Sequence, residues 1–388
     1  MKIVYCLPQV YKPGGIERIV SIKANYFAEM CNYEVYIITS CQKGLPPYYD
    51  FSGKIKFIDL DIDYDSILSY PLCKRIFYKL NYLRRHKKLL STLLCKLKAN
   101  IVVSTFTHEA SFLPKIKDGS KKVLEFHFCK GHKRKMADAF GFSFLTRCIY
   151  YFRCWQEENI IVPKYDSFVV LTKEDQIQWL DRNPQTICIP NILPFDVDKV
   201  SLLTSKSVIA VGRLDSQKGF DRLIKVWLKV SKLYPDWTLH IYGEGPDRKK
   251  LLQLIAELDL EASVVIHPPT NRIMDCYLAS SIFVMTSRYE GLPMTLLEAT
   301  SLGLPAVCYD FQCGPKDVIV DKQNGFLIQE DDEEAMISCM DMLMKDECLR
   351  EEMGKEAKLL SVRYSVDSIM PKWINLFNDL CFNDKNGK

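Results

Sequence analysis

Short apolar runs alternate along this chain with longer stretches in which apolar residues recur every three or four positions. The short runs are rich in β-branched and aromatic residues, which is typical of buried strands, and the longer stretches are typical of amphipathic helices. Strands are predicted at residues 2–7, 33–39, 55–60, 100–105, 122–127, 167–171, 208–211, 238–242, 263–266, 281–285 and 304–309. Helices are predicted between them, for example at 221–233 and 247–258, and almost throughout 333–382.

This alternation predicts an α/β protein with parallel sheets that are covered by helices on both faces. It is interrupted near residues 189–194, a proline-flanked stretch after which the pattern restarts. With 388 residues, the chain is long enough for two domains of ordinary size. We therefore expect two Rossmann-like domains that face an interdomain cleft, formed by residues 1–192 and 193–367. A terminal helix at about 368–388 is expected to pack back on the first domain.

The 15 cysteines are odd in number and scattered, and no C-x-x-C pair occurs. This pattern argues against a disulfide framework or a zinc ribbon, and we interpret the cysteines as reduced thiols in a cytoplasmic protein. The apolar run after Lys2 is too short for the core of a signal peptide. The longest apolar stretch elsewhere, 139–152, is broken by Arg147 and is shorter than the ~20 residues of a membrane span, so we expect no crossing of the bilayer.

Charge is distributed unevenly, with 29 Lys and Arg against 18 Asp and Glu in residues 1–195, and 23 against 30 in residues 196–388. Nine basic residues lie in the acid-free segment 66–108, which is predicted to form a basic amphipathic helix. With a second basic stretch at 130–135, this surface suits the anionic headgroups of the inner membrane face, although a solvated helix face has the same composition. Nucleic acid is disfavoured as a partner, because the pI of about 8.2 is modest and no nucleic-acid-binding motif occurs.

Ligands of open parallel sheets bind beyond the carboxyl ends of the strands, so the residues that follow each strand are the first candidates for a site. After the first strand, Gly14 and Gly15 form a turn before a helix, whose free amides suit a phosphate or a sugar hydroxyl. An ordinary tight turn is the alternative, and the third glycine of a dinucleotide fingerprint is missing. The fifth strand is predicted to end at His127, which places an imidazole at the rim of the cleft; a structural histidine is the other interpretation.

Two cations follow the first strand of the second half, in the segment that contains Gly212, Arg213 and Lys218. A guanidinium and an ammonium at one strand end suit a diphosphate, because arginine binds it through two hydrogen bonds and lysine neutralises developing charge. Charges on a solvated surface loop are the alternative interpretation.

The strongest signal is the segment 285–299, which contains Glu290, Gly291, Leu292, Pro293 and Glu298. Pro293 is predicted to be the first residue of a helix, with Glu290 just before the helix and Glu298 about a turn and a half inside it. Amides near the start of the helix suit an anion, and the two carboxylates can accept hydrogen bonds from sugar hydroxyls. A nucleotide sugar offers both groups, because it is a diphosphate with a hydroxylated ring on each side.

Six motifs occur in order along nearly the whole chain. They are the Gly-Gly turn, the histidine after the fifth strand, Gly-Arg-Leu-x-x-x-Lys-Gly at 212–219, Gly-Glu-Gly-Pro at 243–246, two glutamates eight residues apart, and Asn-Gly-Phe-Leu at 324–327. Together they resemble the retaining glycosyltransferases of family 4, which have the GT-B fold. The segments 287–293 and 313–317 are also similar to the amylovoran-type exopolysaccharide galactosyltransferases.

The resemblance implies a role for each matching residue. Arg213 and Lys218 would hold the donor diphosphate, Glu290 the hydroxyls of the transferred sugar, and Glu298 the ribose. His127 would lie beside the sugar, so that His127, Arg213, Lys218 and Glu290 form the expected catalytic set. The donor-binding set would add Gly14, Gly15, Gly212, Gly243, Gly291, Leu292, Pro293 and Pro269, the last in a base-reading turn that lacks the glycine commonly found there.

Four aspartates, Asp59, Asp61, Asp63 and Asp65, contain the D-x-D pattern with which the other glycosyltransferase fold holds a metal. Strand alternation predicts that all four lie on one side of a third strand, and we interpret them as a solvated strand edge. We expect no catalytic metal, and no cofactor besides the nucleotide sugar that serves as donor substrate.

The resemblance implies transfer of a hexose, galactose or glucose, from a nucleotide-diphosphate sugar that we expect to be UDP-linked. The acceptor would be a lipid-diphosphate-linked glycan or an oligosaccharide in bacterial capsule, exopolysaccharide or lipopolysaccharide synthesis, at the inner face of the plasma membrane. The alternatives are a sugar-nucleotide epimerase or hydrolase of the same fold, a non-catalytic nucleotide-sugar-binding protein and, more distantly, an NAD-dependent dehydrogenase. The sequence leaves the oligomeric state open.

Overall fold

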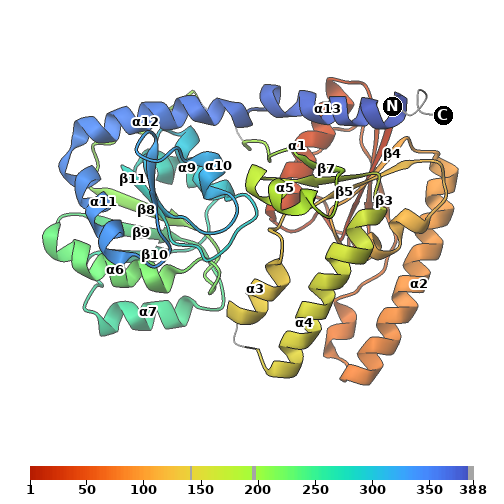
Figure 1. Ribbon diagram of the computed structural model, residues 1–388, viewed down its shortest axis with the longest axis horizontal. Helices are drawn as coiled ribbons and strands as arrows, with labels where there is room; N and C mark the ends of the chain where they lie inside the picture. Colours follow the sequence, from red (N-terminus) through yellow and green to blue (C-terminus); the bar gives the residue numbers. More distant parts are fainter. Residues whose placement is uncertain (140–141, 195–197, 383–388) are drawn as a thin grey trace.

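Two parallel β-sheets, each flanked by helices, form the two halves of the molecule (Figure 1). The computed structural model describes residues 1–139, 142–194 and 198–382. The strand order is β3-β2-β1-β4-β5-β6-β7 in the first sheet and β10-β9-β8-β11-β12-β13 in the second. Two Rossmann-like domains were predicted from the sequence, and this fold class is confirmed.

The first sheet consists of β1 (Lys2–Leu7), β2 (Glu34–Thr39), β3 (Lys56–Asp59), β4 (Ile101–Ser104), β5 (Lys121–Glu125), β6 (Ser167–Val170) and β7 (Thr186–Cys188). Its helices are α1 (Gly15–Glu29), α2 (Leu72–Leu97), α3 (His132–Ala139), α4 (Phe144–Gln156) and α5 (Lys173–Leu180). Short helical turns are η1 (Ser66–Ser69), η2 (His108–Ser111), η3 (Leu113–Lys115), η4 (Glu157–Ile161) and η5 (Val162–Lys164).

The second sheet consists of β8 (Ser207–Val211), β9 (Thr238–Tyr242), β10 (Val264–His267), β11 (Ile282–Met285), β12 (Ala306–Tyr309) and β13 (Gly325–Ile328). Its helices are α6 (Phe220–Leu233), α7 (Arg248–Glu257), α8 (Ile273–Leu278), α9 (Met294–Ser301), α10 (Pro315–Val318), α11 (Glu333–Lys345) and α12 (Glu347–Ser361). The turn η6 (Val362–Tyr364) then leads to α13 (Val366–Phe382).

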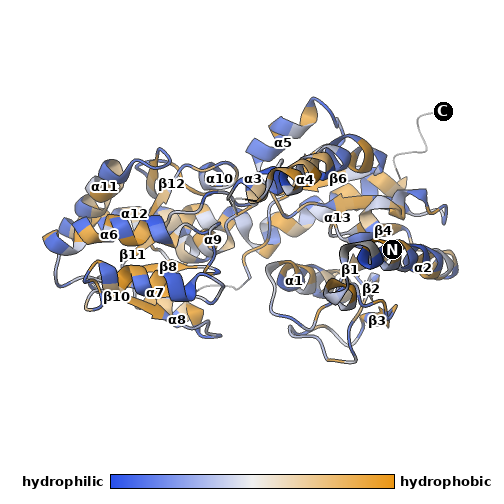
Figure 2. Cartoon of the chain, turned by 90° about the horizontal axis from the view of Figure 1, so that it is seen from below, coloured by the Kyte–Doolittle hydropathy of each residue, from blue (hydrophilic) through white to orange (hydrophobic). Residues whose placement is uncertain are grey.

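Both faces of the first sheet are buried, because alternate residues of its strands enter two different apolar clusters. Ile3 and Tyr5 of β1 pack in one cluster with residues of α1 and α13, whereas Val4 and Cys6 pack in the other with residues of α2. In Figure 2 the strands are mainly hydrophobic along their length, while α6 and α7 alternate hydrophobic and hydrophilic residues. Because both faces are buried, the strands appear in the sequence as short continuous runs of apolar residues.

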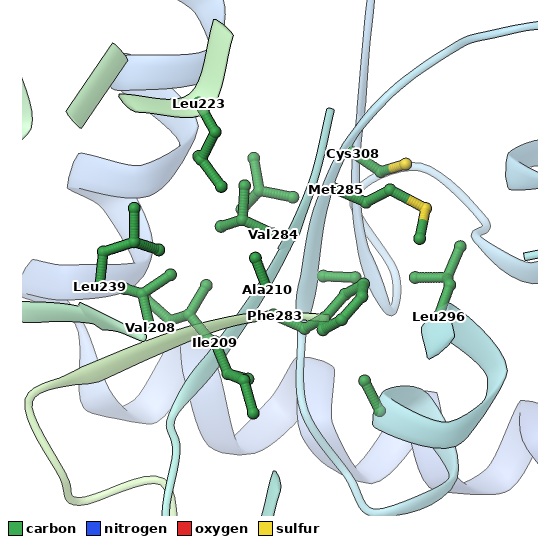
Figure 3. Packing of buried hydrophobic residues seen from close by; sticks show 14 of the residues in the cluster. Val208, Ile209, Ala210, Leu223, Leu239, Phe283, Val284, Met285, Leu296 and Cys308 are labelled. Atoms are coloured by element: carbon green, nitrogen blue, oxygen red, sulfur yellow. The ribbon is translucent and has the colours of Figure 1, made fainter. Parts of the chain in front are cut away.

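In the second domain, α6 and α9 pack through buried apolar side chains on the central strands of the sheet. Leu223 of α6 and Val284 of β11 belong to the same buried cluster, and Met285 points toward Leu296 of α9 (Figure 3). Because β8 and β11 are neighbours in the sheet, the loops 212–219 and 286–293 that follow them leave the same edge side by side.

All eleven predicted strands are present, but β7 and β13 were missed and some boundaries differ. β7 has three residues and β13 begins with a glycine, so neither carries a clear strand pattern. β5 ends at Glu125, so His127 lies two residues beyond the strand that was predicted to contain it.

The expectation that four aspartates share one side of a strand is wrong. β3 ends at Asp59, and Asp61 has a positive φ of 50°, which breaks the alternation that a strand requires. The carboxylate of Asp59 instead accepts hydrogen bonds from Oγ1 of Thr39 at 3.0 Å and from the amide of Gln42 at 2.9 Å. Asp63 lies 3.3 Å from Nζ of Lys43.

The predicted basic amphipathic helix is present as α2, whose 26 residues follow η1. Its second half packs on the first sheet through Leu90 and Leu94, while Ile76, Phe77 and Leu80 in the first half are exposed. Within residues 1–139, 142–194 and 198–382, no helix combines the length and apolarity that a membrane span needs.

Helix α13 returns the chain to the first domain after α12 has crossed the second (Figure 1). Trp373 and Phe377 of α13 belong to the apolar cluster that contains Ile3 and Val35 of the first sheet. Nζ of Lys23 lies 4.2 Å from the centre of a Trp373 ring. The predicted terminal helix extends to 388, and residues 383–388 of that prediction lie outside the described part.

We expect Trp373→Ala to lower the free energy of unfolding by about 3–5 kcal/mol, because it leaves a cavity beneath the first sheet. Urea unfolding followed by circular dichroism measures this loss. Phe382→Ala is the matched control on the same helix, since Phe382 is exposed and its removal should change stability by less than about 0.5 kcal/mol. Equal effects of the two substitutions would contradict the packing described for α13.

Candidate functional site

Lys218 and Glu290 form an ion pair between the loops that follow β8 and β11. Nζ of Lys218 donates to Oε1 of Glu290 at 2.5 Å, and Oγ of Ser287 donates to the same oxygen at 2.9 Å. Nε2 of Gln217 donates to Oε2 of Glu290 at 3.4 Å. The side chains of Lys218 and Glu290 are mostly buried, so the pair has a defined geometry.

Two glycines give these loops their path. Gly219 precedes α6 with a φ of 65°, and a Cβ there would come closer than 3.0 Å to the carbonyl oxygen of Thr286. At Gly212, a Cβ would lie 3.1 Å from the aliphatic carbons of Lys218, so that side chain runs over the glycine. The absence of a side chain at Gly212 therefore leaves space for the Lys218 side chain to reach Glu290.

Arg213 carries a cation that faces solvent beside this pair. Its side chain is 68% exposed, and its Nε donates to Oδ2 of the buried Asp215 at 2.5 Å. The Asp215 carboxylate thus binds Nε of the guanidinium. The two terminal nitrogens stay available to an anion from the solvent side.

Gly291 brings the two domains into backbone contact. A Cβ on Gly291 would lie closer than 3.0 Å to the carbonyl oxygen of His127 and 3.2 Å from Cα of Phe128, both in the first domain. Only glycine allows this approach, so Glu290 and His127, which are far apart in sequence, lie on facing loops. The structure thus brings together the two predicted groups from opposite domains.

His127 lies next to a buried ion pair of the first domain. Nε2 of His127 is 3.3 Å from Oε1 of Glu125, which is also paired with Nζ of Lys23. Burial alone would raise the pKa of Glu125, but the charges of Lys23 and His127 lower it, and the carboxylate stays ionised. Glu125 can therefore hold the orientation of the imidazole.

Glu298 also connects the domains. Its Oε1 lies 3.2 Å from Nη1 of Arg18 in α1, and its Oε2 accepts a hydrogen bond from the Tyr277 hydroxyl at 3.2 Å. Burial raises the pKa of Glu298, and the charge of Arg18 opposes that effect. Pro293 caps α9 just outside the helix, which begins at Met294, so it is not the first helical residue as predicted.

Gly14 is the N-cap of α1, and Gly15 is its first residue. A Cβ on Gly14 would clash with the carboxylate of Glu17, which accepts a hydrogen bond from Nε2 of Gln9 at 2.7 Å. Burial raises the pKa of Glu17, and its backbone hydrogen bond and the charge of His127 lower it. Arg18, the next residue of α1, lies 3.2 Å from Oε1 of Glu298. The Gly-Gly turn thus borders the same site.

Leu292, Gly243 and Pro269 complete the predicted set. Leu292 is buried in the second core, and a Cβ on Gly243 would clash with the carbonyl oxygen of Gly212, so the turns after β8 and β9 touch. Pro269 is exposed after the edge strand β10, which β9 separates from β8. It therefore lies about 10 Å, or two strand spacings, from the β8 loop along the sheet.

Four buried polar atoms around these loops have no hydrogen-bond partner among the described residues: Oε2 of Glu125, Oδ1 of Asp215, Oγ of Ser216 and Oγ1 of Thr295. Nε2 of His127 has only its 3.3 Å approach to Glu125. Buried polar atoms are normally paired, so their concentration here indicates positions where a polar ligand or water binds. In the described part of the chain, no group of three or more His, Cys, Asp or Glu side chains is placed to hold a metal ion.

Sequence reasoning missed the residues that support this site, namely Arg18, Gln217, Tyr277, Ser287 and the Lys23–Glu125 pair. Arg18 follows the Gly-Gly turn in sequence, which was a usable signal. Lys23 lies in the middle of α1 and Tyr277 near the end of α8, and both reach the site only through the fold.

We expect Gly291→Ala to destabilise the contact between the domains by about 1–3 kcal/mol, because the new Cβ meets backbone atoms that cannot rotate away. Scanning calorimetry should show a lower unfolding temperature for this variant. Gly53→Ala is the control, since a Cβ at Gly53 meets no atom within 4 Å. An unchanged temperature for Gly291→Ala would contradict the close approach to His127.

Comparison with known proteins identifies relatives over the whole chain. Residues 196–360 match the family model described as Glycosyl transferases group 1. A glycosyltransferase of Haemophilus influenzae is 31% identical over 378 residues, which cover 96% of this chain and 98% of that protein. The amylovoran biosynthesis glycosyltransferase AmsD of Erwinia amylovora is 36% identical over 222 residues, which cover 55% of this chain and 62% of AmsD.

The solved structure of TarM from Staphylococcus aureus, in complex with UDP, fondaparinux and α-GlcNAc-glycerol, has the same fold. The two superpose with a TM-score of 0.75 and 19% sequence identity, over 97% of this chain and all of that one. The full-length match to a relative above 30% identity establishes the family. The chain belongs to the group 1 glycosyltransferases, and its paired Rossmann-like domains form the GT-B fold.

Proposed function

We propose that the protein is a retaining hexosyltransferase of family 4, which moves galactose or glucose from a UDP-linked donor to a lipid-linked or oligosaccharide acceptor. The UDP in the TarM complex supports this choice of donor, and the name of AmsD, an amylovoran biosynthesis glycosyltransferase, supports a place in bacterial polysaccharide synthesis. We propose that the product is an exopolysaccharide, a capsule or a lipopolysaccharide. One observation carries the proposal: the Lys218–Glu290 pair lies directly beside the Gly291 contact with His127.

The reaction breaks an anomeric C–O bond, and negative charge develops on the departing diphosphate. Nζ of Lys218 uses one N–H for Glu290 and keeps two for phosphate oxygens, while Arg213 offers the terminal nitrogens that Asp215 leaves unused. Fixed cations of this kind stabilise the charge that develops in the transition state. We propose that they supply the positive charge without a metal ion.

Glu290 serves as an acceptor for sugar hydroxyls in this proposal. Lys218, Ser287 and Gln217 already donate to its two oxygens, which orients the carboxylate and disfavours its use as a nucleophile. Two carboxylate oxygens offer about four acceptor positions, so room remains for the sugar. Without a protein nucleophile, retention implies attack on the face of the leaving phosphate, which then takes the proton of the acceptor.

Glu298 is proposed to bind the ribose, and the unpaired Oγ1 of Thr295 lies in the same helix, α9. His127 lies on the opposite domain beside the transferred sugar. Closure of the domains around the donor would exclude water and favour transfer over hydrolysis.

We further propose that the first domain rests on the cytoplasmic face of the membrane. Apolar side chains are exposed on α2 and α4, and basic residues lie among them; the apolar ones are Ile76, Phe77, Leu80, Phe144, Leu145, Ile149, Phe152 and Trp155. A surface with both kinds of side chain binds anionic headgroups and acyl chains together.

We expect the purified protein to hydrolyse one UDP-hexose slowly in the presence of EDTA, when a panel of UDP- and GDP-sugars is tested. Lys218→Met should lower kcat by about 10²–10³-fold, because it removes the cation that stabilises the leaving diphosphate. Lys225→Met is the matched control, since Lys225 is exposed on α6, the helix that follows the same loop.

Equal rates for the two variants would contradict the role of Lys218, and activity only after addition of a divalent cation would contradict a metal-free mechanism. Addition of a glycan acceptor separates the alternatives, because a transferase extends the acceptor, whereas an epimerase or hydrolase leaves it unchanged. Tight donor binding without any turnover would indicate a binding protein.

A further inference from the structure

A second polar pocket lies in the first domain, between α2 and α4, outside the donor site described above. This α2–α4 pocket has a volume of about 450 Å³. Its lining includes Lys79 of α2, His108 and Ser111 of η2, Lys133 of α3 and Arg153 of α4. Figure 1 shows α2, α3 and α4 together on one side of the first domain.

The charges of this pocket are not balanced. Lys79, Lys133 and Arg153 face a single carboxylate, Glu157, which pairs with Lys133. Burial lowers the pKa of Lys79, and the charge of Arg153 lowers it further. The same two causes lower the pKa of Lys133 to about 8. The three cations therefore repel one another, and an anion bound among them would relieve that repulsion.

Neighbouring cations show that this imbalance is particular to the pocket. Arg134 pairs with Glu158, and Arg147 pairs with Asp138 at 2.6 Å. Across residues 1–139, 142–194 and 198–382, by contrast, neither Lys79 nor Arg153 makes an ion pair. The two free cations come from different helices and converge on one cavity, which is the arrangement that a phosphate group requires.

Uncharged groups of the pocket can complete the binding of an anion. Burial lowers the pKa of His108 to about 4, so its imidazole is neutral and can donate one hydrogen bond without adding charge. Its ring stacks on Tyr64 with 3.7 Å between centres, which fixes its orientation. Ser111 adds a hydroxyl to the lining.

The pocket opens at the same edge of the sheet as the candidate reaction site. Pro8 and Phe106, which line the pocket, follow β1 and β4, and His127 follows β5, the neighbour of β4. The ring of Phe106 lies 4.9 Å from the ring of Phe126, next to His127. The strand-end part of the pocket lining therefore lies next to the β5 loop.

We propose that the α2–α4 pocket binds the phosphate or diphosphate of an acceptor, so that the acceptor is a phosphate-bearing glycan whose hydroxyl reaches the site at His127. This inference rests on the proposed transferase function. The lining carries three cations against one carboxylate, which matches the charge of a diphosphate ester. Exposed apolar residues flank Arg153 on α4, at Phe152 and Trp155, where a lipid tail attached to the phosphate would lie.

Isothermal titration tests the pocket with inorganic pyrophosphate, in the presence of saturating UDP to occupy the donor site. We expect one pyrophosphate to bind besides UDP. Lys79→Met and Arg153→Met should each weaken pyrophosphate binding by about tenfold or more, because each removes one charged hydrogen bond. Lys88→Met is the matched control, since Lys88 is exposed on α2 outside the pocket, and should bind pyrophosphate as the unchanged protein does.

The UDP titration separates the two proposals. Suppose that Lys218→Met loses UDP binding while Lys79→Met and Arg153→Met keep it. This result supports the donor site, regardless of whether pyrophosphate binds. The acceptor-pocket proposal alone would be overturned if no pyrophosphate binds under saturating UDP. It would also be overturned if both pocket substitutions leave pyrophosphate affinity unchanged.

Competition identifies the source of the phosphate. Displacement of pyrophosphate by a soluble glycosyl phosphate, or by a glycosyl diphosphate with a short prenyl tail, supports the assignment. A tenfold advantage for the prenyl compound would identify a lipid-linked acceptor. Displacement by phosphatidylglycerol vesicles and by neither glycosyl compound would overturn the assignment, because the pocket would then bind lipid headgroups.

Discussion

The approach of Gly291 to the backbone of His127 is the constraint on which the site depends. The second domain supplies Arg213, Lys218 and Glu290 from the ends of β8 and β11, and the first supplies His127 from the end of β5. None of these elements forms a complete site alone. A side chain at position 291 would push the loops apart, so the absence of a Cβ at Gly291 allows the loops that carry Glu290 and His127 to face each other.

Two layers of charge surround that contact. The inner layer consists of paired groups, with Lys218 on Glu290, Lys23 on Glu125 and Arg18 on Glu298. These pairs fix side-chain positions in buried surroundings, where an unpaired charge would be costly. The outer layer consists of cations with free hydrogen-bond donors, namely Arg213 beside the Lys218–Glu290 pair and the cations of the α2–α4 pocket. This division is what the proposed reaction between a nucleotide-sugar donor and a phosphate-bearing acceptor requires.

The sequence predicted the elements well, because buried parallel strands read as short apolar runs and the helices between them keep a clear period. It failed where a few residues decide the structure. The segment from Asp59 to Asp65 alternates in sequence as a strand does, but the backbone turns at Asp61, which has a positive φ. β13 begins with a glycine and carries no clear strand pattern. The sequence could point to Lys218 and Glu290 as candidates because they lie in the loops that follow β8 and β11. Tyr277 and Lys23, in contrast, reach the candidate site from helices whose placement depends on packing. The α2–α4 pocket was read only as a basic surface, since convergence of three helices is a tertiary property.

A single site built from both domains can be detected by amide hydrogen exchange. We compare exchange with and without the UDP-hexose that the donor panel identifies. We expect the UDP-hexose to slow exchange in residues 126–131 of the first domain as well as in residues 212–219 and 286–293 of the second. Protection confined to the second domain would contradict a site built from both domains, because the donor would then be held without the loop that carries His127.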